Sequence, residues 1–462
     1  MISIIIAPLT LVLIIVFIAT GKLNRLVASL TGAIIVAFSL IYIDKIDMMI
    51  VAGFIFGEND SNLQAILFIF GMMVIIIICK KSGVFIYIAF RLVQFAKGNG
   101  SYILYILCFF SFIFSSLSSN IVCIFLIIPL TITICKMLDI NPIPYILSEG
   151  MVINLGGLLF VISSIPNLLI SNSINWTFPQ YFMDIGFFSI ILFLISIIFL
   201  SRYNKEKLKI PKAERIELLL DYDAWMFVKS KKNFYKSLIM FILTITAVII
   251  VPLISTISID IIALIGGILT ILLVLNDKFE LLWKELDLEL IFYLFCILFI
   301  SEAITFTGVL TFVSSGLNYI TGGDLISTSL LLLWISGILS SIMDNAPITK
   351  IFIPIVNNMS TLGNQRILFS AVSVGTILGE NLSIMGDNLV LILMVREYGY
   401  QLTFSTFMKL GIVITVIQLI ASSIFLIMKI SNQFFFIGLL LLILILLIVS
   451  FYPKILKILK NL

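Results

Sequence analysis

Long apolar segments, separated by short polar ones, run through almost the whole chain. Of its 462 residues 61% are hydrophobic and only 11% are charged, and the mean hydropathy is +1.25. Soluble proteins carry about 25% charged residues. Apolar surface on this scale is stable only in lipid, so the sequence predicts an all-α polytopic membrane protein.

The lengths of the apolar segments predict how often the chain crosses the bilayer. A helix needs about 20 apolar residues to cross, and two stretches of the chain, 101–136 and 326–362, are much longer than this and break near their middles. Each is either two short spans or a re-entrant hairpin, and the hairpin interpretation brings the loop charges into agreement. The other predicted spans are 2–20, 26–43, 63–79, 144–174, 182–201, 237–255, 260–276, 288–304, 366–396, 404–430 and 433–452.

The loop charges orient the chain, because cytoplasmic loops carry an excess of Lys and Arg. Loop 202–236 has ten Lys or Arg against five Asp or Glu, whereas loop 44–60 has four acids and one lysine. We therefore expect a cell-membrane protein with its N-terminus outside and its basic C-terminal tail in the cytoplasm. One segment is an exception, because 277–289 is acidic and yet is predicted to be cytoplasmic.

The chain repeats itself after 225 residues. The residues matched by this shift include Gly83 with Gly308, Asn120 with Asn345, and Pro129 with Pro354. The first copy starts outside and the second starts at the cytoplasmic face, so the two copies are predicted to be inverted, as in secondary transporters. The expected parts are a first repeat (1–201, hairpin 101–136, broken helix 144–174), a cytoplasmic linker (202–236), a second repeat (237–430, hairpin 326–362, broken helix 366–396) and a further span with a basic tail (433–462).

Each repeat has a second polar interruption beyond its hairpin. These are NLGGLLFVISSIPN (154–167) and GENLSIMGDN (379–388). Irregular backbone at membrane depth is tolerated only where it lines a cavity or is buried in protein. Freed carbonyl groups with Asn and Ser oxygens suit a hard cation such as Na⁺, and freed N–H groups suit an anion. A single break could equally be a packing kink, but four symmetric breaks favour a binding site.

Ionisable residues inside apolar segments point to the same places. Each Asp or Lys at a helix centre costs about 2.5–3.5 kcal/mol. We therefore interpret Asp344, Asp387 and Glu380 as carriers of the coupling ion. Lys350 is expected to pair with an acid, or else to face an anion. Glu149 and Glu302 are either further functional acids or groups solvated near the interface.

Several functions are excluded or disfavoured. The chain has no histidine, which excludes His-dependent triads and His metal sites, and no G-x-x-x-x-G-K-[ST] loop for ATP. The net charge of +4, with the basic residues in loops, does not indicate nucleic acid. The five cysteines are interpreted as buried hydrophobes, with Cys123 and Cys135 as the only candidates for a thiol pair that binds arsenite or a soft metal. We expect neither an enzyme nor a cofactor beyond the coupling Na⁺ or H⁺.

Four motifs in the first repeat resemble a known family. FGMMVIIIICKKSGVFIYIAFRLVQFAKGN (70–99), SSLSSN, LSEGMVINLGG and IPN look like the arsenite permease and citrate transporter-like group of the ion transporter superfamily, whose relatives include divalent anion–sodium symporters and NhaD-type antiporters. The resemblance covers about residues 1–430. It implies a scaffold domain and a mobile transport domain, an elevator motion and a homodimer in the lipid bilayer.

The resemblance also implies where ions and substrate bind. In relatives the hairpin tips and broken helices form the site, with Na⁺ expected here at Ser119, Asn120, Asp344 and Asn345. The residues carried over are Ser118, Ser119, Asn120, Asn154, Gly156, Gly157, Pro166, Asn167, Asp344, Asn345, Pro347, Asn381, Ser383, Gly386, Asp387 and Asn388.

The acids are distributed differently from the family pattern. Relatives usually have Asp-Asn at both tips and Gly-Asp-Pro-Pro-Asn in the first break, whereas this chain has Ser119-Asn120 and a Ser-Ser-Ile-Pro-Asn break at 163–167. Glu380 and Asp387 stand where relatives typically have small residues. The acid has moved to the second repeat, which weakens the case for arsenite and leaves coupling to Na⁺ or H⁺ intact.

We therefore expect a secondary active transporter that moves a small inorganic or organic anion against a Na⁺ or H⁺ gradient. The alternative is a Na⁺/H⁺ antiporter, favoured by five acids against one lysine in the apolar segments. A channel or a non-transporting scaffold would leave the symmetric hairpins unexplained. No arginine lies near the breaks in the sequence to clamp a dicarboxylate, so a large dianion such as citrate is a weaker expectation than a small substrate.

Overall fold

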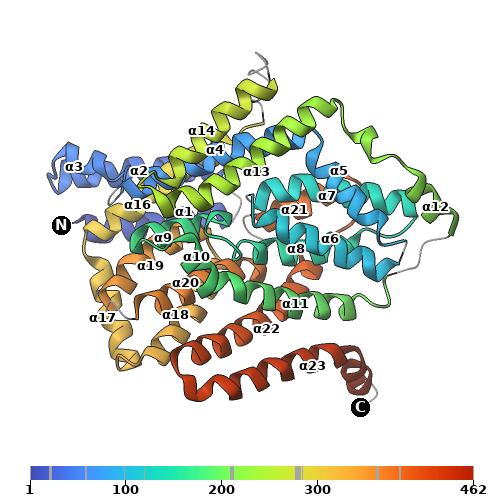
Figure 1. Ribbon diagram of the computed structural model, residues 1–462. Helices are drawn as coiled ribbons and strands as arrows, with labels where there is room; N and C mark the ends of the chain where they lie inside the picture. Colours follow the sequence, from blue (N-terminus) through green and yellow to red (C-terminus); the bar gives the residue numbers. More distant parts are fainter. Residues whose placement is uncertain are drawn as a thin grey trace.

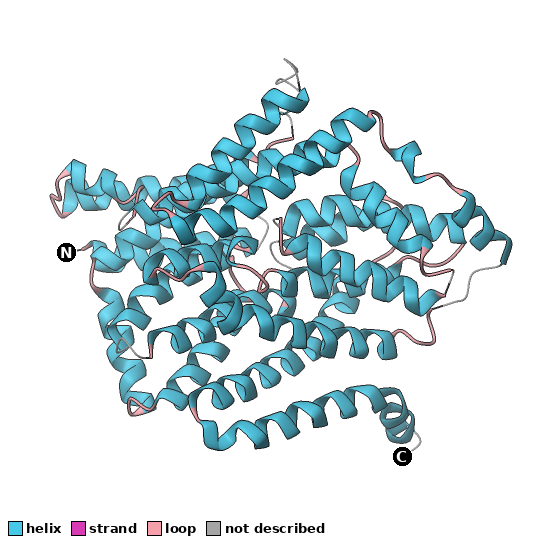
Figure 2. Ribbon diagram, viewed as in Figure 1, coloured by secondary structure: helices cyan, strands magenta, loops and turns pink. Residues whose placement is uncertain are grey.

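The computed structural model describes residues 2–19, 23–57, 60–97, 99–118, 120–208, 213–275, 282, 285–359, 364–383 and 387–460. Its described residues form helices and connecting loops, with no strand among them (Figure 2). This confirms the predicted all-α class. Eight helical stretches in the described part are long and apolar enough to cross a bilayer. All but one coincide with predicted spans; the exception is α7 (Asn120–Leu138), the second limb of the predicted hairpin 101–136.

The helices follow the predicted segments closely (Figure 1). Those of the first half are α1 (Ser3–Ala19), α2 (Arg25–Phe38) continued by η1 (Ser39–Ile43), α3 (Met48–Gly53), α4 (Ser61–Lys81), α5 (Val84–Gln94), α6 (Gly100–Ser115), α7, α8 (Ile143–Gly156), η3 (Val161–Ser163), α9 (Ile165–Ile174), α10 (Phe178–Tyr181), η4 (Phe182–Gly186) and α11 (Phe187–Tyr203). The predicted broken helix 144–174 is thus α8, an interruption containing η3, and α9.

The second half begins after two short linker helices, α12 (Ala213–Asp221) and η5 (Ala224–Phe227). Its helices are α13 (Lys231–Ile254), α14 (Ile259–Thr270), η6 (Ile271–Leu275), α16 (Leu288–Phe306), α17 (Val309–Thr321), α18 (Leu325–Ser340), α19 (Asn345–Met359), α20 (Gln365–Gly379), η7 (Glu380–Leu382), α21 (Asp387–Glu397) and α22 (Phe404–Ile430), followed by η8 (Asn432–Phe434) and α23 (Phe435–Lys460). In Figure 1, α23 lies beside α22 along the lower edge of the molecule.

The helix boundaries repeat at the spacing predicted from the sequence. Helices α17, α18 and α19 each begin 225 residues after α5, α6 and α7, and α20 and α21 each begin 222 residues after α8 and α9. Gly83 and Gly308, which precede α5 and α17, both have left-handed backbone, with φ of +80° and +75°. The repeat therefore extends to backbone conformation.

The two matched glycines predict unequal effects of the same substitution. Alanine in the left-handed region costs about 1–2 kcal/mol, and this is the cost expected for Gly308→Ala, where no atom lies within 4 Å of an added Cβ. At Gly83 the Cβ would lie 2.7 Å from the carbonyl oxygen of Phe227, so Gly83→Ala should lower the melting temperature further. Thermal unfolding in detergent measures both, and equal shifts would contradict this packing.

Close helix packing recurs in both repeats. Gly156 of α8 packs directly on Phe112 and Ser115 of α6, and Gly375 of α20 packs in the same way on Leu333 of α18. Small residues allow such close approach in membrane interiors. Each hairpin is thereby fixed to the broken helix that follows it.

Polar contacts show which loops share a face of the molecule. Asp44, after α2, accepts hydrogen bonds from the Ser3 hydroxyl and from the backbone N–H groups of Ile2 and Ser3, which hold its pKa below the usual range. The start of α1 and the segment after α2 therefore lie on one face. This agrees with the relative sides predicted from the loop charges.

Ion pairs explain the acidic segment that the loop charges left as an exception. Arg25 lies 3.2 Å from both Asp287 and Glu289, and Lys81 lies 3.3 Å from Glu285. The acids of 285–289 thus pair with basic residues of the face predicted to be cytoplasmic.

Candidate functional site

Both hairpin tips and both breaks meet around one cavity of about 110 Å³, which we call the central cavity. Helices α7 and α19 reach it with their first turns, and α2 and α16 close it from the side. Its lining includes Arg25, Asn120, Ser163, Ser164, Pro166, Tyr293, Asp344, Asn345, Glu380 and Asp387. Residues more than 350 positions apart in the chain therefore face the same space.

Glu380 lies between the two hairpin tips. Asn345 donates its side-chain Nδ2–H to Glu380 Oε1 at 2.5 Å, and Asn120 donates to Oε2 at 3.4 Å. The two asparagines are the residues matched by the 225-residue repeat. One carboxylate, which can accept both bonds at once, thus connects the two tips.

A chain of buried asparagines links the two breaks behind the cavity. Asn120 donates to Asn154 Oδ1 at 2.9 Å, and Asn154 donates to Asn381 Oδ1 at 3.0 Å. Asn381 in turn donates to the carbonyl oxygen of Met151 at 3.1 Å. Asn154 and Asn381 are 1% and 0% exposed. Water cannot reach their amide groups, so these hydrogen bonds are what satisfies them.

Two further asparagines fix the irregular backbone of the breaks. Asn167 donates to the carbonyl oxygen of Gly157 at 2.7 Å and accepts from Ser373 of the other repeat at 2.7 Å. Asn388 donates to the carbonyl oxygens of Glu380 at 2.8 Å and Ser383 at 3.1 Å. These bonds satisfy carbonyl groups that the interrupted helices cannot pair themselves.

Asn154→Leu is expected to destabilise the protein. The substitution removes the acceptor of Asn120 and the donor to Asn381, and each orphaned buried group costs about 1–3 kcal/mol. Thermal unfolding in detergent should show a clear fall, whereas Asn318→Leu, on an exposed position of α17, should change little. Equal melting temperatures for Asn154→Leu and the unmodified protein would show that the asparagine chain has no structural role.

The predicted site residues separate into groups. Asn120, Pro166, Asp344, Asn345, Glu380 and Asp387 line the central cavity, and Asn154, Gly157, Asn167, Asn381, Ser383 and Asn388 take part in the hydrogen bonds around it. Three belong to neither group: Gly156 packs on α6, Ser118 lines a neighbouring cavity, and Pro347 lines a small cavity together with Asp344. Ser119 and Gly386 lie outside the described residues, so the expected Na⁺ site is represented by Asn120, Asp344 and Asn345.

Arg25 and Tyr293 line the central cavity but were missed in the sequence. The expectation that no arginine lies near the breaks is wrong, because the fold brings Arg25, more than 90 residues before the first tip, to the cavity wall. Its position at the start of a span was used only to orient the chain. Tyr293 gives no sequence signal, because a tyrosine is an ordinary residue in a membrane span.

Other predictions are settled by single contacts. Lys350 lies 2.9 Å from Glu302, which confirms the expected ion pair. Glu149 is 0% exposed and accepts a 2.7 Å hydrogen bond from Thr131, so solvation near the interface is the wrong interpretation for it. Cys123 and Cys135 lie twelve residues apart on α7, a rise of about 18 Å, and cannot form a thiol pair.

The central cavity is lined mainly by oxygen-bearing side chains, although no three acidic or cysteine side chains of the described residues are grouped closely enough to hold a metal ion by themselves. Asp344, Glu380 and Asp387 each bring a carboxyl group to its wall, while Arg25, the one basic residue among the described residues of its lining, is paired with Asp287 and Glu289. Asn120 Oδ1 and Ser164 Oγ are buried and have no hydrogen-bond partner among the described residues. Carboxylate, amide and hydroxyl oxygens are the ligands of hard cations, and carboxylates also carry protons.

Comparison with known proteins identifies the family. Residues 15–256 and 249–460 match the family described as "Citrate transporter". A 46 kDa membrane protein of Mycobacterium leprae is 25% identical over 88% of this chain and 95% of its own length, and an uncharacterized transporter of Mycobacterium tuberculosis is 26% identical over 89% and 95%. The mouse P protein is 20% identical over 76% of this chain and 52% of its own length.

Two solved transporters share the fold. The YdaH transporter of Alcanivorax borkumensis superimposes with a TM-score of 0.58 at 14% identity, covering 79% of this chain and 84% of that one. MtrF of Neisseria gonorrhoeae, described as one of a class of antimetabolite efflux pumps, gives 0.55 at 14% identity over 79% and 80%. With its motifs, its apolar helices and these matches, the chain is a multi-pass membrane transporter that belongs to the citrate transporter family.

Proposed function

We propose that this protein is a secondary active transporter that moves a small inorganic or organic anion coupled to a Na⁺ or H⁺ gradient. The observation that carries the proposal is the position of Glu380, which accepts a hydrogen bond from each hairpin tip in a cavity with two further acids. A cation bound at Glu380 contacts both repeats at once. Its binding or release can therefore change the hydrogen bonds by which Glu380 holds the two hairpin tips.

The charges also account for coupling. Two unit charges 4 Å apart interact by about 4 kcal/mol at the effective dielectric constant near a protein surface. Without a cation, the carboxylates of Asp344, Glu380 and Asp387 repel an approaching anion. Once Na⁺ or protons neutralise them, the repulsion falls and the anion can bind, so that the two move together.

The proposed moving part consists of the hairpins and broken helices, α6–α9 and α18–α21. Both groups are fixed internally by the close contacts of Gly156 and Gly375 and to each other by the asparagine chain. The remaining helices would form the scaffold of a homodimeric elevator in the cell membrane, with the N-terminus outside and the C-terminus in the cytoplasm.

A second function is favoured by one observation. Arg25, the basic residue of the central cavity, is already paired with two acids. A site with three carboxyl groups and no unpaired cation in its described lining could exchange Na⁺ for H⁺ without any anion.

Uptake into proteoliposomes tests the main proposal. The purified protein would be supplied with radiolabelled citrate, a smaller carboxylate, phosphate or arsenite under an imposed Na⁺ or pH gradient. We expect saturable accumulation of one anion that requires one of the gradients. Uptake that does not saturate and needs neither gradient would overturn the proposal in favour of a channel.

A further inference from the structure

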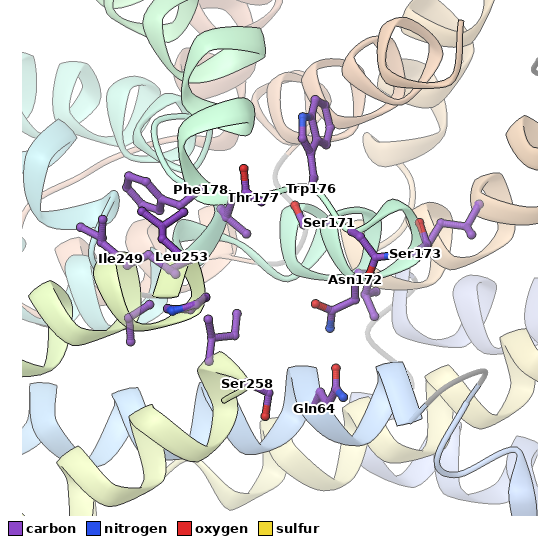
Figure 3. A pocket seen from close by; sticks show the side chains of 18 of the residues that line it. Gln64, Ser171, Asn172, Ser173, Trp176, Thr177, Phe178, Ile249, Leu253 and Ser258 are labelled. Carbon is purple, nitrogen blue, oxygen red and sulfur yellow. The ribbon is translucent and has the colours of Figure 1, made fainter. Parts of the chain in front are cut away.

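A second and larger cavity, of about 580 Å³, lies between the end of α9 and the helices α4, α13, α14 and α19; we call it the large cavity (Figure 3). Its volume is typical of small-molecule sites. It reaches the first break at Val161 and Ile162. A smaller cavity continues from Ile162 to Ser163, Ser164 and Ile165, which border the central cavity. The three cavities therefore adjoin one another along the first break.

The walls of the large cavity are of two kinds. Figure 3 shows Phe178, Ile249 and Leu253 on one side, and Ser171 and Asn172 on the other. Figure 3 also shows Ser173 beside Ser171 and Asn172; Gln64 and Asn357 are further polar residues of the lining, and Val248 and Pro252, on the same helix as Ile249 and Leu253, are further apolar ones. This division matches a ligand with one apolar and one polar end.

The charge of the lining is opposite to that of the central cavity. Lys350 is its one charged residue, and no Asp or Glu is among the described residues that line it. Lys350 is 6% exposed and its Nζ lies 2.9 Å from Glu302, which is not part of the lining. An ammonium group has three N–H donors, and the pair with Glu302 occupies one side of it.

Ser171 supplies a second buried donor. Its residue is 4% exposed, and its Oγ has no hydrogen-bond partner among the described residues. A buried hydroxyl without a partner costs free energy, and a ligand that accepts its hydrogen bond removes that cost. Lys350 and Ser171 both line the same cavity.

We propose that the large cavity is a binding site for an amphipathic organic anion, with its carboxylate at Lys350 and Ser171 and its apolar part against Phe178, Ile249 and Leu253. The inference rests on the proposed function only in taking an anion as the transported partner. The anion and the coupling cation then have separate sites, both bordered by residues of the first break. Lys350 is the residue that selects the sign of the charge.

Trp176 reports on occupancy of the large cavity, because it is part of the lining. With Trp225, Trp283 and Trp334 replaced by phenylalanine, the remaining tryptophan fluorescence comes from Trp176. The protein in detergent is titrated with hexanoate, and with hexylammonium as the probe of opposite charge. We expect a saturable change with hexanoate and none with hexylammonium. A flat hexanoate titration, or equal responses to both probes, would overturn the proposal.

Variants of the ion pair separate binding from folding. Lys350→Met should weaken hexanoate binding at least tenfold, and Glu302→Gln should strengthen it, because the ammonium then lacks its internal partner. Since Lys350→Met leaves Glu302, whose side chain is only 15% exposed, without its partner, the variant can fail to fold, and the double variant Lys350→Met/Glu302→Gln avoids that charge. The double variant should fold and bind no hexanoate; binding as in the parent protein would overturn the proposal.

Lys81→Met is the matched control, because Lys81 is also paired with an acid but is not among the residues of the large cavity. It should leave hexanoate affinity unchanged, and a loss equal to that of Lys350→Met would count against a local site. Failure of the proposed function gives a different pattern: gradient-driven uptake would be absent while hexanoate still bound and Lys350→Met still weakened it.

Discussion

Asp387→Asn is expected to abolish gradient-driven transport while folded protein remains in the membrane. Asp387 is the first residue of α21 and lines the central cavity with Glu380 and Asp344. Asparagine keeps the size and shape of the side chain. The substitution therefore removes mainly the charge, and with it a ligand for Na⁺ or a carrier for H⁺.

The measurement for Asp387→Asn is uptake into proteoliposomes under an imposed gradient, compared with exchange of labelled for unlabelled anion without a gradient. We expect gradient-driven uptake to be lost. Exchange without a gradient should persist as long as the variant still binds the anion. Glu397→Gln is the matched control, since Glu397 is an exposed acid at the other end of the same helix. Unchanged gradient-driven flux in Asp387→Asn would remove Asp387 from the coupling mechanism.

Glu380→Gln is expected to weaken binding of the coupling cation by about tenfold to a hundredfold. The cation is proposed to bind where Glu380 holds both tips, so the free energy of one tip's hydrogen bond to a charged group, about 1.5–3 kcal/mol, is lost from cation binding, and about 1.4 kcal/mol corresponds to a factor of ten. Glutamine has one acceptor oxygen where Glu380 has two, so one of Asn120 and Asn345 faces an amide N–H group in place of an acceptor. The tips then lose their common partner.

The dependence of uptake on Na⁺ concentration or pH measures this loss. The half-saturating cation concentration should rise for Glu380→Gln, and it should stay the same for Glu217→Gln, in the exposed part of the linker helix α12. An unchanged cation dependence in Glu380→Gln would mean that the bonds from the tips serve only to hold the structure.

Sequence patterns predicted the fold well because membrane helices leave a strong signal. Glycine, asparagine and proline are rare enough in an Ile- and Leu-rich chain that three matched pairs disclosed the 225-residue repeat, which recurs in the starts of α5 to α7 and α17 to α19. Polar residues in apolar spans are costly, so Asn120, Asn345 and Glu380 stood out individually. Their direct contact did not follow from the sequence, since it depends on how the two repeats pack.

The features that were missed depend on tertiary structure. Arg25 lies at the start of a span, where a basic residue is an ordinary orientation signal, and only the packing of α2 on α16 brings it to the central cavity. Apolar helix faces form much of the wall of the large cavity, and in sequence they look the same as faces toward lipid. Glu149 is fully buried beside Thr131. The sequence shows that it is an acid in an apolar segment, but not how deeply it is buried.

The central claim is that a cation bound at the acids of the central cavity couples to movement of an anion. Its most direct test is the dissipation of a pH gradient in proteoliposomes that contain no candidate anion. Na⁺, Li⁺ and K⁺ are added in turn. The account predicts no response to any of the three, because the cation moves only with its co-substrate. Dissipation by one cation alone, lost in Asp387→Asn, would contradict it and identify the protein as a cation/proton antiporter.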